Sequence, residues 1–72
     1  MGNVGERIAM ARGYNRLTQG QLAAAMNVTV QTISNWERSR RMPDADAMRS
    51  LCIIMNVSCD WLLGLSDRME LK

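Results

Sequence analysis

The stretch TVQTISNWERSRRMP, residues 29–43, carries the clearest structural signal in the chain. Plotted as a helix at about 100° per residue, it separates into two sides. The mostly apolar side holds Val30, Ile33, Trp36 and Glu37. The other side holds two carboxamides one turn apart and an arginine: Gln31, Asn35 and Arg38. The apolar side predicts a helix packed on a core. The polar side is followed closely by Arg40 and Arg41. It is either ordinary solvated surface or a surface that binds a specific partner.

Cap and breaker residues on both sides of this stretch predict four more helices and no strand. Thr18 to Gln21 reads TQGQ, a capping box in which the Thr18 side chain and the Gln21 side chain satisfy each other's backbone amides. The five expected helices run from Gly5 to about Tyr14, from after Thr18 to Asn27, from Thr29 to about Arg38, from Asp44 to Asn56, and from Ser58 to Gly64. Only Asn27 and Val28 separate the second helix from the cap of the third, so these two helices must cross steeply.

The composition is that of one small all-α domain. The chain has 72 residues, of which 47% are apolar, so one compact core is expected. No run approaches the ~20 apolar residues that a membrane span needs, and the N-terminus lacks a signal-peptide pattern, so we expect a cytoplasmic protein without a membrane segment. We expect residues 1–66 to form the domain and residues 67–72 to be a loose tail.

The two cysteines and the absence of histidine argue against metal and redox chemistry. Cys52 and Cys59 alone cannot supply the usual four ligands of a zinc site. Cys52 lies in the apolar run LCIIM, which favours a reduced core residue. The chain also lacks a Gly-rich phosphate loop, clustered carboxylates and an activated nucleophile. We therefore expect no metal, no cofactor and no enzyme activity.

Charge is distributed unevenly along the chain. Residues 1–43 hold six arginines and two glutamates, whereas residues 44–72 hold three basic and five acidic residues. A basic end suits a polyanion that approaches one face, although a net charge of +2 is also common in proteins without such a partner.

Taken together, these motifs resemble the Cro and repressor type of helix-turn-helix protein, the xenobiotic-response-element family of bacterial and phage regulators. The likeness runs from about Val4 to Leu65 and depends on the order of its parts. These parts are TQ-x-x-LA in the second helix, the turn Val28, the inward Ile33, the pair Trp36-Glu37, Pro43, and the ending VS-x-D-x-LL. Asn27 and Asn56 stand where the family usually has glycine, which Asn can replace because it tolerates left-handed backbone geometry.

The resemblance implies a five-helix, lambda-repressor-like bundle whose second and third helices form the helix-turn-helix, with the third in the DNA major groove. The base-contacting positions implied are Val30, Gln31 and Asn35, with Thr32 as a further candidate for either a base or a phosphate. The phosphate-contacting positions are Gln19, Thr29, Arg38, Arg40 and Arg41. The resemblance also implies an internal salt bridge between Arg12 and Glu37. Trp61 and Leu65, with Ile53 as a further candidate, are possible dimer contacts, although half-buried core is an equal alternative for Trp61.

The chemistry of Gln31 and Asn35 narrows the expected target. Gln and Asn bond bidentately to adenine N6 and N7 in the major groove, and each good pair contributes ~1–3 kcal/mol of discrimination. We therefore predict A·T-containing half-sites in a near-palindromic operator on double-stranded DNA, bound by a homodimer that acts as a transcriptional regulator, in the first instance a repressor. The alternative is a protein-interaction module, such as an antitoxin that binds a toxin as well as its own promoter, or an adaptor.

Overall fold

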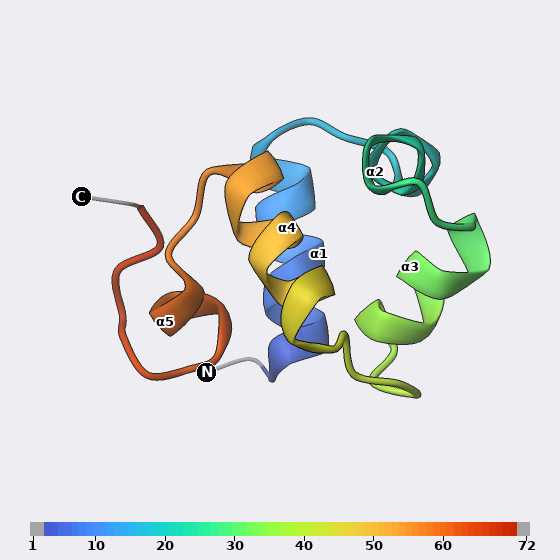
Figure 1. The fold of residues 1–72 in the computed structure, drawn as a ribbon. Coiled ribbons are helices and arrows are strands. Elements are labelled where there is room, and N and C mark those ends of the chain that lie inside the picture. The colour runs from blue at the N-terminus through green and yellow to red at the C-terminus, as the bar shows by residue number, and fades with distance from the viewer. Residues whose placement is uncertain (1–2, 71–72) are drawn as a thin grey trace.

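Five helices enclose one core in the computed structural model, which describes residues 3–70 (Figure 1). Their bounds are α1 Val4–Tyr14, α2 Gln19–Met26, α3 Val30–Glu37, α4 Ala45–Met55 and α5 Cys59–Leu62. In Figure 1, α1 and α4 lie together at the centre, with α2 and α3 on one side and α5 with the segment after it on the other. Of the five helices described, none is long and apolar enough to cross a membrane. The expected all-α, five-helix fold is confirmed.

Most predicted helix boundaries are confirmed because their capping interactions form, whereas α5 ends at Leu62 and not at the expected Gly64. Thr18 Oγ1 accepts from the Gln21 N–H at 3.0 Å, and Gln21 Oε1 accepts from the Thr18 N–H at 2.8 Å. Asn27 and Asn56 end α2 and α4 in the left-handed conformation, with φ of 59° and 55°. One capping box was not predicted: Asn3 caps α1 through Glu6, which starts that helix at Val4.

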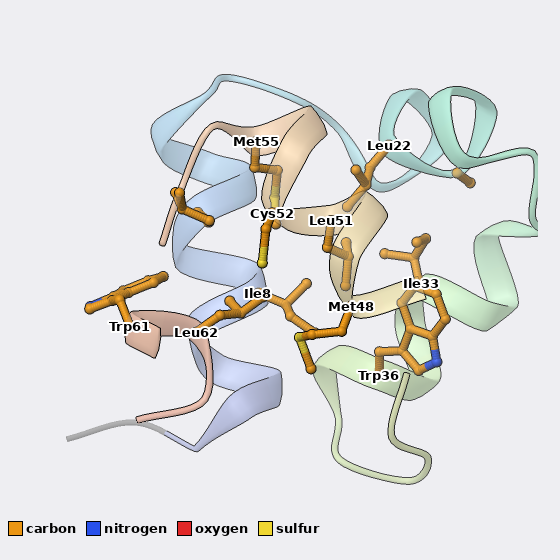
Figure 2. Close-up of a cluster of buried hydrophobic side chains, with 13 residues drawn as sticks. Ile8, Leu22, Ile33, Trp36, Met48, Leu51, Cys52, Met55, Trp61 and Leu62 are labelled. Atoms are coloured by element: carbon orange, nitrogen blue, oxygen red, sulfur yellow. The ribbon is translucent and has the colours of Figure 1, made fainter. Parts of the chain in front are cut away.

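The core lies between α1 and α4 and receives side chains from both flanks (Figure 2). Leu22 and Ile33 enter it from α2 and α3, and Trp61 and Leu62 enter it from α5 (Figure 2). The residues of α4 expected to face inward are buried: Met48, Leu51, Cys52 and Met55. Val30 departs from the helical-wheel prediction, because as the first residue of α3 it is 48% exposed.

The prediction that Cys52 is a reduced cysteine is wrong in this structure. Its sulfur lies within bonding distance of the Cys59 sulfur, and the two form a disulfide with Cα atoms 5.7 Å apart. The reversal of the chain at Asn56 and Val57 causes this pairing, because it returns the first residue of α5 to the last turns of α4. That Cα separation is within the usual range for a disulfide.

The segment expected to be a loose tail is packed as far as the structure describes it. The Ser58 N–H donates to the Met69 carbonyl at 2.7 Å, and Val57 and Glu70 form an isolated antiparallel bridge. Met69 is half-buried against the core. The chain is thus held at Met69 and Glu70, whereas Asp67 and Arg68 are exposed; residues 71–72 lie outside the described range.

Candidate nucleic-acid interface

The connection between α2 and α3 is a tight turn closed by backbone hydrogen bonds. Asn27 donates its N–H to Ala24 O at 3.2 Å, and Val28 donates to Ala23 O at 3.0 Å. Thr29 then caps α3, its Oγ1 accepting from the Thr32 N–H at 3.1 Å. Because only two residues lie between the helix end and the next cap, α3 is held against α2 at a fixed crossing.

The inner side of α3 is anchored by burial and by one carboxylate. Ile33 is fully buried and Trp36 is 7% exposed. Glu37, the last residue of α3, accepts from Arg12 Nε at 2.6 Å and from Arg12 Nη2 at 3.2 Å, so the salt bridge implied by the resemblance is present. The hydrogen bond to Glu37 raises the pKa of Arg12, with burial opposing that rise.

Gln19 takes part in the same cluster. Its Nε2 donates to Glu37 Oε1 at 2.9 Å, so this side chain, expected to contact phosphate, is paired with α3 in the structure. The backbone N–H of Gln19 nevertheless lies in the first turn of α2, where amides have no partner within the helix and favour an anion. Three helices thus meet at Glu37, which fixes where α3 lies relative to α1 and α2.

The outer side of α3 carries the four residues predicted to contact bases. Val30 and Gln31 are exposed, and Thr32 and Asn35 are half-exposed. Two hydrogen bonds that the sequence analysis did not anticipate organise this side. Gln31 Nε2 donates to Asn35 Oδ1 at 3.1 Å, and the hydroxyls of Thr29 and Thr32 lie 2.9 Å apart. The i, i+4 spacing of Gln31 and Asn35 was the signal that could have predicted the first.

The arginines that follow α3 lie close to Asn35 because the backbone turns back on the helix end. Ser39 adopts a left-handed conformation with φ of 62°, and Arg40 donates its N–H to Asn35 O at 2.9 Å. Arg41 donates to the same carbonyl at 3.4 Å. The side chains of Arg38, Arg40 and Arg41 are exposed. The structure therefore brings a cluster of positive charge to the end of the helix face that carries the carboxamides.

A groove of about 510 Å³ adjoins this face. Its polar lining residues are Thr32, Asn35, Arg41 and the acidic Asp44, and its apolar lining includes Trp36 and Met42. The groove itself carries charges of both signs, so the positive charge that suits a phosphate backbone comes from the exposed Arg38, Arg40 and Arg41 beside it.

The three predicted dimer contacts divide into two kinds. Trp61 is only 5% exposed and lies under the Arg7 guanidinium, whose carbon is 4.9 Å from the centre of the ring. Trp61 is therefore a core residue of the single chain, the alternative given for it, and its part in a dimer contact stays a prediction. Leu65 and Ile53 are 75% and 68% exposed and stay available for contacts with a second molecule.

Comparisons with known proteins agree with this geometry. A family model described as Helix-turn-helix matches residues 8–62. The chain is 39% identical over 65 residues to the HTH-type transcriptional regulator ImmR of Bacillus subtilis (strain 168), a match that covers 90% of this chain and 51% of that protein. It is 28% identical over 67 residues to the uncharacterized HTH-type transcriptional regulator YobD of the same organism, covering 93% and 60%. The chain thus spans about half the length of the first of these relatives.

A solved structure shows the same arrangement. The crystal structure of the P22 c2 repressor protein in complex with synthetic operator 9T in the presence of Tl⁺ matches with a TM-score of 0.84 and 30% sequence identity. The match covers 92% of this chain and 100% of that chain. The resemblance on which the sequence prediction rested is confirmed for the fold.

Proposed function

Because the chain belongs to the helix-turn-helix family, we propose that it is a sequence-specific regulator that binds double-stranded DNA with the outer side of α3 in the major groove. The observation that carries the proposal is the division of α3. One side is fixed by Ile33, Trp36 and Glu37, and the other presents Gln31 and Asn35 beside an arginine cluster. The relatives include a transcriptional regulator and an operator-bound repressor, which supports repression as the mode of action.

Base contacts and phosphate contacts come from different parts of this surface. Val30, Gln31, Thr32 and Asn35 face base edges, and Gln31 and Asn35 account for the A·T content of each half-site. Arg38, Arg40 and Arg41, together with Thr29 and the backbone N–H of Gln19, bind phosphates and set the register of α3 on the duplex.

The protein acts as a homodimer on a near-palindromic operator in the cytoplasm. The exposed Leu65 and Ile53 support this assembly, because large apolar side chains that are 75% and 68% exposed gain free energy when a second copy covers them. Two copies related by a two-fold axis would read half-sites about one helical turn apart. A toxin or other protein partner is the second role that the family fold allows.

Selection of bound sites from random duplex DNA, at two stated salt concentrations, tests the proposal. We expect one enriched half-site, repeated with two-fold symmetry, and binding that weakens as salt rises. Arg40→Ala should reduce the slope of log K against log salt by about 0.9 and weaken binding to all sequences alike.

Arg68→Ala is the matched control, because Arg68 is an exposed arginine in the segment that follows α5. Figure 1 shows that segment on the opposite side of the molecule from α3. It should leave the slope unchanged. A folded protein with no salt-sensitive DNA binding would refute DNA binding and favour the adaptor role. An unchanged slope in Arg40→Ala would remove Arg40 from the phosphate contacts.

A further inference from the structure

Cys52 and Cys59 form a covalent link at the junction of α4 and α5. Their Cα atoms are 5.7 Å apart, and the link joins the last turns of α4 to the first residue of α5. In the reducing cytosol disulfides are rare, and those that occur are usually transient and serve catalysis or redox sensing. A regulator that binds DNA in the cytoplasm meets the reductants that keep thiols free there, so this disulfide is expected to open and close.

The two cysteines differ in their access to a reductant. Cys52 is 5% exposed and belongs to the core. Cys59 is half-buried and lines a second groove, of about 400 Å³, together with Arg49 of α4 and Leu63 at the end of α5. Thiol–disulfide exchange begins when a thiolate attacks one of the two sulfurs, so it depends on access. A reductant in the groove therefore attacks the Cys59 sulfur, and Cys52 is the leaving group.

Reduction of this link takes two exchange steps and one dithiol. A thiolate of the dithiol attacks Cys59 Sγ, the S–S bond breaks, and its electron pair leaves on Cys52 Sγ, which takes up a proton. The second thiolate of the dithiol then attacks its own sulfur in the mixed disulfide, and Cys59 leaves as a thiolate that is protonated in turn. The protein gains the two electrons and two protons that the dithiol loses. Oxidation is the reverse, with a small-molecule disulfide such as glutathione disulfide as the oxidant.

Loss of the link should loosen α5 without unfolding the chain. α5 has four residues, too few to be stable as an isolated helix. Trp61 and Leu62 are buried, and Arg7 donates to the Trp61 carbonyl whether or not the cysteines are joined, so α5 keeps its place on the core. Reduction removes the constraint that fixes the first residue of α5 relative to α4.

Exposed apolar side chains lie on both sides of this link. Ile53 follows Cys52 on α4 and is 68% exposed, and Leu63 and Leu65, beyond Cys59, are 44% and 75% exposed. A second copy that covers these side chains binds more tightly when their relative positions are fixed in advance, because less conformational entropy is lost on association. The proposed DNA-binding helix does not depend on the link, since α3 is held by the contacts of Glu37 with α1 and α2.

We propose that the pair Cys52 and Cys59 is a reversible thiol switch on dimerisation. The oxidised protein binds its full operator as a dimer, and reduction weakens the dimer without changing how each copy contacts its half-site. The inference rests on the proposed function, and it adds to that function a chemical signal, the thiol–disulfide balance of the cell, that controls it.

Binding to a full operator and to a single half-site, both taken from the selected sites, tests the switch. The wild type is treated with dithiothreitol or with glutathione disulfide, and mass spectrometry of the intact chain identifies its redox state. We expect the oxidised protein to bind the full operator about 10-fold more tightly than the reduced protein, and both to bind the half-site equally. Hydrogen exchange at the amides of Leu62 and Leu63 should be about 10-fold or more faster after reduction, with the α3 amides unchanged.

Cys59→Ser is the control, because it cannot form the disulfide. It should behave like the reduced wild type after either treatment. Cys59→Ala should match it, which separates the loss of the link from any effect of the serine hydroxyl. Circular dichroism shows whether each variant is folded.

The outcomes separate this inference from the function on which it rests. Equal binding of the full operator by the oxidised and reduced wild type would overturn the switch, as would a stable glutathione adduct on Cys59 in place of the internal disulfide. A Cys59→Ser protein that still responds to the two treatments would also overturn it. Each of these results leaves salt-sensitive binding of the half-site intact, so the proposed function would stand. Folded protein that binds neither duplex in either redox state would refute the proposed function and this inference together.

Discussion

α3 and α5 are both short helices packed on the same core, but they are held there in different ways. α3 is fixed at its end by the Glu37 carboxylate, which accepts from Arg12 of α1 and from Gln19 of α2. α5 has four residues and rests on Trp61 and Leu62, both buried. Its other connections are the disulfide from Cys59 and one buried arginine, Arg7, which donates to the Trp61 carbonyl at 2.5 Å.

This difference indicates that the helix proposed to contact DNA, α3, is held more firmly than α5, which only packs on the core. A side chain that reads a base must be held close to its working position, and contacts from several helices achieve this for α3. The disulfide holds the start of α5, but the residues after Cys59 depend on a few contacts with residues far apart in sequence, such as Arg7 with Trp61. We therefore expect the end of α5 to open at a lower free energy than α3. Substitutions that affect one helix and not the other test this contrast.

The largest effect is expected from Ile33→Ala. Ile33 is fully buried where α3 meets the core, so its truncation should lower the free energy of unfolding by roughly 2–5 kcal/mol. Urea denaturation followed by far-UV circular dichroism measures the change. Met10→Ala is the control, because Met10 is 54% exposed on α1 and lies outside the proposed DNA and dimer contacts, so it should change stability by no more than about 0.5 kcal/mol. Equal effects of the two substitutions would contradict the anchoring of α3 described above.

The next largest effect is expected from Gly5→Ala. A Cβ at Gly5 would collide with the Trp36 carbonyl oxygen and lie 2.8 Å from the Glu37 carbonyl oxygen, so α1 could not keep its approach to the end of α3. We expect a loss of roughly 2–3 kcal/mol by the same denaturation assay.

Gly13→Ala is its control, because nothing lies within 4 Å of a Cβ at this other α1 glycine. Alanine there should stabilise the protein by about 0.5–1 kcal/mol, since it favours the helix over the unfolded chain. Destabilisation by both substitutions would point to the loss of glycine itself and not to the contact between α1 and α3.

Most of the fold could be predicted because its signals are local. Thr18, Thr29, Asp44 and Ser58 cap helices through side chains that bond to amides three residues away, and such pairs are visible in the sequence. The contact between Arg12 and Glu37 was predicted by resemblance alone, since no local rule joins residues 25 positions apart.

The parts that could not be predicted depend on tertiary contacts. Arg7 is 3% exposed and stacks on Trp61, yet nothing near it in sequence distinguishes it from an exposed arginine. Trp61 is buried in the core beneath that guanidinium, and no local pattern separates this position from a half-exposed one. Met69 lies against the core because the chain returns to Ser58, and the polar composition around it gave no sign of this return.

Arg7→Met tests the weaker attachment of α5. Methionine keeps much of the apolar stem but removes the donors to the Trp61 and Ser66 carbonyls and the stack on the ring. We expect a loss of about 2 kcal/mol, because hydrogen bonds from a charged group are lost in a buried site. Hydrogen exchange should show faster exchange at the amides of Leu62 and Leu63. The α3 amides should be unaffected; equal acceleration in both helices would mean that they unfold as one unit.

Glu37→Gln should give the smallest effect, about 1 kcal/mol, because glutamine keeps one oxygen as an acceptor while its NH₂ group faces at least one of the three donors, Arg12 Nε, Arg12 Nη2 and Gln19 Nε2. The pKa of Arg12 is raised in the folded protein by its hydrogen bond to Glu37. Stability that arises from a raised pKa is fully present below the unfolded-state pKa of arginine and is lost only as pH rises through the folded-state value. The contribution of the Arg12 pKa to the stability lost in Glu37→Gln should therefore be constant from about pH 6 to 9, measured by urea denaturation across that range.

In Glu37→Gln, amide hydrogen exchange should accelerate at the end of α3 and not in α5, the reverse of the pattern expected for Arg7→Met. The same pattern in both variants would show that the two helices open together.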